Sequence, residues 1–133
     1  MARQSLPVLV GVAQWMERDL DPADAPDPST LLGQLARSAA EDADAEGELL
    51  ERVDTLALTP IAGWDADSAT ACVAEEIGAS PSKGSCGSAG GEVGITLLND
   101  AARAIPDGES RVAPVAGCNL MGVPYPASRS RTF

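Results

Sequence analysis

Hydrophobic residues in this sequence alternate between short β-type runs and segments with helical spacing. Leu6–Val12 is a continuous apolar run that includes three β-branched valines, which is typical of a strand covered on both faces. We therefore expect this run to form a central strand. Three further runs also predict strands, and the second of them is the weakest because it is rich in Gly and Ser: Asp54–Pro60, Lys83–Ser88 and Arg111–Cys118.

A first helix is predicted after the loop at Asp19–Pro28, which carries three prolines and four aspartates. Ser29 or Thr30 can cap this helix, and Gly47 lies near its expected end. A short acidic helical turn then leads into the second predicted strand. The apolar residues of the first helix recur at helical spacing and form one stripe: Leu31, Leu32, Leu35, Ala36 and Ala39.

Two more helices follow. The apolar pattern of Ala66–Ile77 predicts a helix that ends at Gly78 and places Cys72 in the core. The other begins after Gly90–Gly91 and stops at Pro106. Its predicted buried stripe consists of Leu97, Leu98, Ala101, Ala102 and Ile105.

Strands that alternate with helices predict an α/β fold with a mainly parallel sheet and helices on both faces. The length of 133 residues suits one domain. We expect this domain to span residues 1–121. Residues 122–133 then form an irregular tail, because Met121–Phe133 has no apolar periodicity.

Charge and composition narrow the classes of function. The net charge is −11 and the nine basic residues are scattered, which argues against binding to nucleic acid. The acidic segments Glu17–Asp27 and Glu41–Asp54 lack the pattern of a calcium loop, so we interpret them as solvated surface and expect no metal. Leu6–Val12 is too short to cross a membrane, and three cysteines suit neither a disulfide framework nor a zinc site. We expect a soluble, cytoplasmic protein.

Several stretches together resemble one family. From Gly90 to Gly117 the sequence reads GGEVGITLLNDAARAIPDGESRVAPVAG, and Pro7–Gln14, Ser38–Ala43 and Val53–Leu58 precede it in order. They resemble the thiolase superfamily, most closely its acetyl-CoA acetyltransferase-like or sterol-carrier-type branch, whose members act in lipid metabolism. The resemblance implies part of one thiolase half-domain, with strand order 3-2-1-4. We expect a truncated chain that lacks the fifth strand and the second half.

The same resemblance implies coenzyme A thioesters as substrates, no covalently bound cofactor, and a nucleophilic cysteine at the start of the third long helix. Here that position holds Gly91, preceded by Gly90, and the chain contains no histidine to act as a base. Cys86, five residues upstream, is the candidate for a displaced nucleophile, although a packing role is favoured for it because free cysteines are commonly buried. We expect Cys118 to be a packing residue.

The sequence therefore predicts a thiolase-like acyl-CoA acyltransferase fragment that is not competent for catalysis alone. The alternative is a non-catalytic thiolase-like subunit or interaction module. Pro114 lies within the fourth predicted strand, which is tolerated at a sheet edge. Because the missing parts would expose apolar surface, we expect a homo-oligomer or a partner of the thiolase family.

Overall fold

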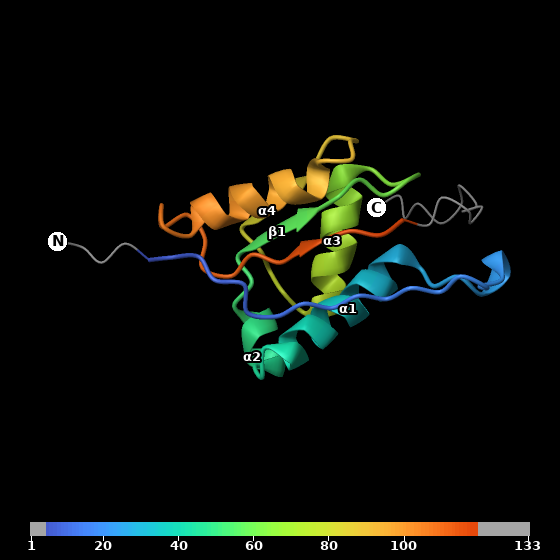
Figure 1. Cartoon of the computed structure of the whole chain (residues 1–133), viewed down its shortest axis with the longest axis horizontal. Coiled ribbons are helices and arrows are strands. Elements are labelled where there is room, and N and C mark those ends of the chain that lie inside the picture. Colours follow the sequence, from blue (N-terminus) through green and yellow to red (C-terminus); the bar gives the residue numbers. More distant parts are fainter. Residues whose placement is uncertain (1–4, 120–133) are drawn as a thin grey trace.

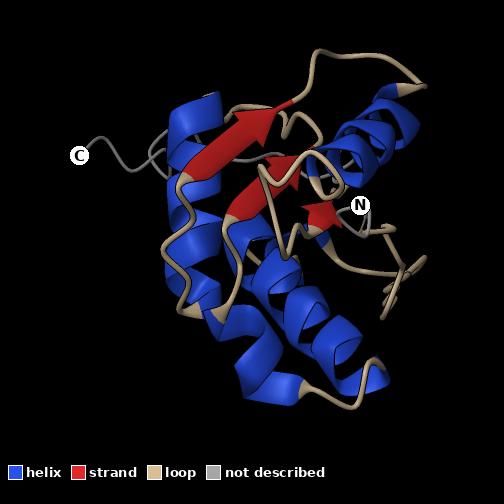
Figure 2. Cartoon of the chain, turned by 90° about the vertical axis from the view of Figure 1, so that its left-hand side faces the viewer, coloured by secondary structure: helices blue, strands red, loops and turns tan. Residues whose placement is uncertain are grey.

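A three-stranded parallel sheet lies at the centre of the computed structural model, which describes residues 5–119. The strands are β1 (Thr55–Leu58), β2 (Lys83–Cys86) and β3 (Val115–Ala116), in the order β2-β1-β3 (Figure 2). The second, third and fourth predicted strands are thus present and parallel. The predicted tail, residues 122–133, lies outside the described residues.

β1 is the central strand because it is paired along both edges. The amide of Ala57 donates to Pro114 O over 3.1 Å, and that of Thr59 donates to Ala116 O over 2.9 Å. On the other side, Gly87 N donates to Leu58 O over 2.9 Å. The Leu58 side chain is fully buried, as expected for a strand that is covered on both faces.

Helices cover both faces of the sheet, as the sequence predicted. α3 (Ala66–Ile77) connects β1 to β2, whereas α4 (Val93–Ala104) leads from β2 back across β1 to β3. Because parallel crossovers are right-handed, this reversal of direction places the two helices on opposite faces, as Figure 1 shows. α1 (Pro28–Asp42) packs against α3, and α2 (Glu46–Glu51) packs against α1. A short 3-10 helix, η1 (Pro22–Asp24), precedes α1.

α1 begins and ends earlier than the sequence predicted. Its cap is Asp27, whose carboxylate accepts hydrogen bonds from the amide of Ser29 over 3.0 Å and from its hydroxyl over 2.6 Å. Pro28 occupies the first turn, where its missing N–H costs nothing. The helix stops at Asp42, and Asp44 then adopts a left-handed φ of 52°. The chain restarts as α2, which is the predicted acidic turn.

The prediction of a central first strand at Leu6–Val12 is wrong. Both edges of β1 are taken by β2 and β3, so no position beside it is open. The segment runs past α1 instead, where the amide of Val12 donates to the Asp42 carboxylate over 2.9 Å. Leu6 is 78% exposed and Val8 is 73% exposed. The strand order 3-2-1-4 is therefore not confirmed, although the other three strands keep the relative order 3-2-4.

The buried stripe of α4 is narrower than predicted. Leu97 and Ala101 are buried against the sheet, but Leu98 is 42% exposed. One helical step of about 100° turns Leu98 away from the sheet that covers Leu97. Cys72 of α3 is buried at 5% exposure, which confirms the prediction that it belongs to the core.

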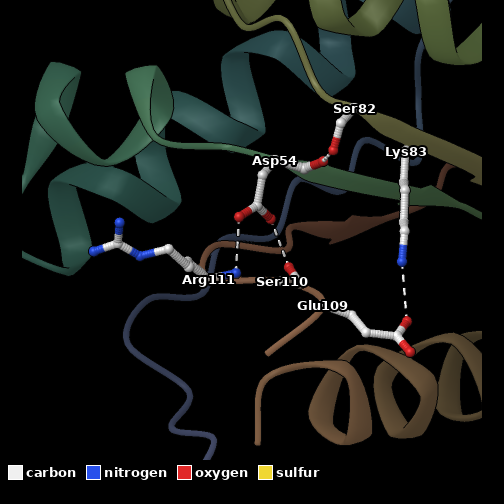
Figure 3. A network of polar contacts seen from close by, with 6 residues as sticks. All are labelled: Asp54, Ser82, Lys83, Glu109, Ser110 and Arg111. Atoms are coloured by element: carbon white, nitrogen blue, oxygen red, sulfur yellow. Dashed lines mark hydrogen bonds and ion pairs between the residues drawn. The ribbon is translucent and has the colours of Figure 1, made fainter. Parts of the chain in front are cut away.

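A polar network centred on Asp54 fixes the end of β1 opposite the cavity described below (Figure 3). The Asp54 carboxylate accepts from the Ser110 hydroxyl over 2.6 Å and from the Arg111 amide over 2.8 Å. Its carbonyl accepts from the Ser82 hydroxyl over 3.1 Å. Burial alone would raise the pKa of Asp54, but the hydrogen bonds from Ser110 and Arg111 outweigh it and the pKa lies below its ordinary value.

We predict that Asp54→Ala lowers the free energy of unfolding by roughly 1–3 kcal/mol, because it leaves the buried Ser110 hydroxyl without its acceptor. The matched control is Asp100→Ala, which removes an exposed carboxylate 3.7 Å from Arg103 and should change stability by less than about 0.5 kcal/mol. Urea unfolding followed by circular dichroism measures both. Equal effects of the two substitutions would contradict a stabilising role of the network.

The same variant tests the lowered pKa of Asp54. A carboxyl group whose pKa is depressed in the folded state stabilises the fold above its unfolded pKa, about 4, and loses that contribution as the pH falls through the folded pKa. The stability difference between wild type and Asp54→Ala should therefore be constant near neutral pH and shrink in acid. A difference that grows in acid would contradict the assignment.

Candidate functional site

An open cavity of about 920 Å³ lies where the carboxyl ends of the three strands meet. In parallel α/β sheets this edge is the usual place for ligands. The loop after β1, the segment that leads into the first turn of α4, and the loop after β3 line the cavity. The lining residues are Pro28, Thr59, Pro60, Ile61, Ala62, Gly63, Ala89, Gly90, Gly91, Val93, Gly94, Gly117, Cys118 and Asn119.

Among residues 5–119, no charged side chain lines the cavity. Its polar side chains are those of Thr59, Cys118 and Asn119, and the rest of the wall is aliphatic or glycine. Within residues 5–119 there is no group of three or more His, Cys, Asp or Glu side chains that could hold a metal ion. The wall therefore suits an uncharged, partly apolar group with a few hydrogen-bonding positions.

Cys118 is the cavity residue that sequence reasoning did not assign to a site. It follows β3 directly, is half-buried, and also packs against the main core cluster. Burial, and secondly the negative charge of Asp27, raise the pKa of the Cys118 thiol. Its position just after a parallel strand could have indicated that it lies at the ligand edge. The raised pKa disfavours the thiolate that nucleophilic attack requires.

Cys86, the candidate for a displaced nucleophile, is the last residue of β2 and lies opposite Leu58 of β1. It is half-buried and does not line the cavity. Burial raises the pKa of its thiol above the ordinary value. Cys86 is thus close in sequence to residues that line the cavity, but it does not line the cavity itself, whereas Cys118 does.

Gly90 and Gly91 form the turn immediately before α4, and both line the cavity. A Cβ atom added at Gly91 would meet no atom within 4 Å, whereas one at Gly90 would come within 2.7 Å of the Glu92 carboxylate. Position 91 therefore has room for a side chain next to the first turn of the helix. The backbone N–H groups of a first helical turn lack intrahelical acceptors and attract negative charge.

Comparison with known proteins relates this arrangement to a solved fold. No protein-family model matches the chain, and no curated protein matches it. Among solved structures, the chain is similar to a monomeric SCP2-thiolase-like protein, type 1, from Mycobacterium smegmatis, with a TM-score of 0.68 and 26% sequence identity. The match covers 84% of this chain and 23% of that chain.

The fold is thiolase-like. This agrees with the family resemblance of the sequence and with the parallel sheet and its two covering layers of helices. The chain spans about a quarter of the length of the solved thiolase-like protein. That protein is described as monomeric, which gives no support to the expected homo-oligomer. No helix within residues 5–119 has the length and apolar character needed to span a membrane.

A Gly91→Cys substitution tests whether the thiolase-like helix start is accessible. We predict that the added thiol reacts with iodoacetamide at least about tenfold faster than the native cysteines near neutral pH, because the helix N-terminus favours thiolate. Cys72 is buried, and the pKa values of Cys86 and Cys118 are raised. Peptide mass spectrometry assigns the labelled sites. Faster labelling of Cys86 than of the introduced thiol would instead support Cys86 as the displaced nucleophile.

Proposed function

We propose that this chain corresponds to the N-terminal portion of a thiolase-like acyl-CoA acyltransferase, of the acetyl-CoA acetyltransferase type, and that it binds the acyl part of a thioester without transferring it. The observation that carries the proposal is Gly91, which lines the cavity at the start of α4 and has no nucleophilic side chain. The thiolase-like fold supports a thioester as the ligand, and the glycine supports the loss of acyl transfer.

Binding of an acyl group follows from the shape and polarity of the cavity. Pro60, Ile61 and Val93 provide apolar wall against which an acyl chain loses contact with water. The first turn of α4 borders the same space, and although Val93 N donates to Gly90 O over 3.3 Å, the other N–H groups of a first helical turn would suit a thioester carbonyl oxygen. These groups orient the carbonyl but do not attack it.

Acyl transfer also requires a nucleophile and a base, and this chain supplies neither in working form. Gly91 has no side chain, and burial raises the pKa values of both Cys86 and Cys118. The sequence contains no histidine that could deprotonate a thiol. The chemical step therefore depends on groups that this polypeptide does not contribute.

The protein should recognise the thioester mainly through its acyl group. The phosphates of coenzyme A are usually bound by Lys, Arg or backbone N–H groups, and no charged residue of the described range 5–119 lines the cavity. A chain with a net charge of −11 also repels a polyanionic nucleotide. The nucleotide should consequently add little to affinity.

A second candidate function is that of a non-catalytic thiolase-like subunit. It is favoured by the outer face of α4, where Ile95 is 65% exposed and Leu98 is 42% exposed. The neighbouring residues Val93 and Gly94 line the cavity, so a protein seated on this face would also cover the open side of the site.

Ligand-observed NMR with two thioesters separates these possibilities. We predict that acetoacetyl-CoA and the acetoacetyl thioester of N-acetylcysteamine, which lacks the nucleotide, bind with affinities within about threefold of one another. Gly91→Leu should weaken binding because the new side chain occupies the cavity wall beside the first turn of α4, where we place the thioester carbonyl. Gly47→Leu is the matched control, since a Cβ at Gly47 also meets nothing within 4 Å and Gly47 does not line this cavity.

Two results would contradict the proposal. Binding that is not weakened in Gly91→Leu would place the ligand elsewhere, and binding of the coenzyme A ester alone would mean that the nucleotide is recognised. If neither thioester binds, acyl binding is wrong and the subunit function takes its place.

A further inference from the structure

The N-terminal segment Leu6–Met16 carries most of the exposed large apolar side chains found in residues 5–119. Seven of the nine lie in it, and Ile95 and Leu98 of α4 are the other two. Exposure is 78% at Leu6, 73% at Val8 and 73% at Leu9. Scattered exposed apolar residues are ordinary, but a contiguous group of this kind marks an interaction surface.

The backbone of this segment is also available for pairing. Figure 1 shows it as an extended trace that passes α1. Val12 is tied to the Asp42 carboxylate by its amide, and Gly11 packs so closely on the Ala39 carbonyl oxygen that a Cβ atom there would collide with it. The segment is therefore anchored at Gly11 and Val12. Before the anchor, no strand of the described sheet pairs with it.

We propose that Leu6–Val12 is a dimerisation strand that pairs antiparallel with the same segment of a second copy of this chain, centred on Leu9. In an extended strand successive amides point to opposite edges, so the edge bearing the Val12 amide faces α1 and the edge bearing Leu9 and Gly11 is free. The free edges of two copies then meet.

This pairing is self-complementary. Leu9 faces Leu9 of the second copy, and Gly11 faces Pro7, whose carbonyl can accept from the glycine amide although the proline has no N–H to donate in return. The side chains of Leu6, Val8, Val10 and Val12 fall on one face. Val8 then lies opposite Val10 of the second copy and Leu6 opposite Val12, in the closely spaced pairs where aliphatic side chains make contact.

The distribution of charge favours pairing with the same segment of a second copy over contact with the other surfaces of that copy. Residues 5–16 carry no charged side chain, whereas the whole chain has a net charge of −11. Two copies therefore repel one another at most surfaces, and the uncharged segment is where they can approach with the least repulsion. The association should tighten as salt rises, because salt screens the repulsion and leaves the apolar contact intact.

Analytical ultracentrifugation across the micromolar range tests the proposal. We expect a monomer–dimer equilibrium for the wild type, tightened by sodium chloride. Val8→Lys should weaken it at least about tenfold, even though the substitution lowers the net negative charge. Ile95→Lys makes the same change in charge at the other exposed apolar surface and should leave the dimer intact.

Mixing two variants tests the register in which the two Leu6–Val12 segments pair. Val8→Lys and Val10→Glu should each be monomeric alone, whereas an equimolar mixture should dimerise because the introduced lysine of one copy then faces the introduced glutamate of the other. Circular dichroism controls for folding, which neither variant should alter because the segment lies outside the sheet. A wild-type monomer at all concentrations, loss of the dimer in Ile95→Lys, weakening by salt, or no recovery in the mixture would overturn the proposal.

Discussion

The pairing of β1 along both of its edges is the constraint on which the rest of this structure depends. β2 and β3 bond directly to it, and the apolar side chains of Leu56 and Leu58 are buried in a core cluster with residues of α1 and α3. Because all three strands run the same way, their carboxyl ends meet, and the loops that follow them form the cavity. The same pairing occupies both places beside β1 and leaves Leu6–Val12 outside the sheet.

Local patterns predicted the elements well, and their failures have definite physical causes. The helical spacing and Gly78 located α3, the apolar run at Asp54–Pro60 located β1, and helical spacing ended by Pro106 located α4. Leu6–Val12 has the composition of a buried strand, but composition does not report whether a neighbouring strand is available. Leu97 and Leu98 were both predicted to be buried because both are apolar. Only the orientation of α4 against the sheet decides that Leu97 is buried and Leu98 is exposed.

The candidate site could be predicted in part. The family resemblance placed the start of the third long helix at Gly90 and Gly91, where the structure has the turn before α4. It did not reveal that Cys118 joins the wall, since that depends on how the loop after β3 turns towards the loop after β1. Nor could sequence spacing show that burial raises the pKa of both half-buried thiols. The cavity thus brings the turn before α4 together with the half-buried Cys118.

The central claim is that this thiolase-like chain holds an acyl group without forming a bond to it. Intact-protein mass spectrometry after incubation with acetyl-CoA near neutral pH tests this most directly, because a thiolase-type mechanism passes through an acyl-cysteine. The account predicts that the wild-type mass stays unchanged after acid quenching. A stoichiometric acetyl adduct that maps to Cys86 or Cys118 and is lost when that cysteine is replaced by alanine would contradict it.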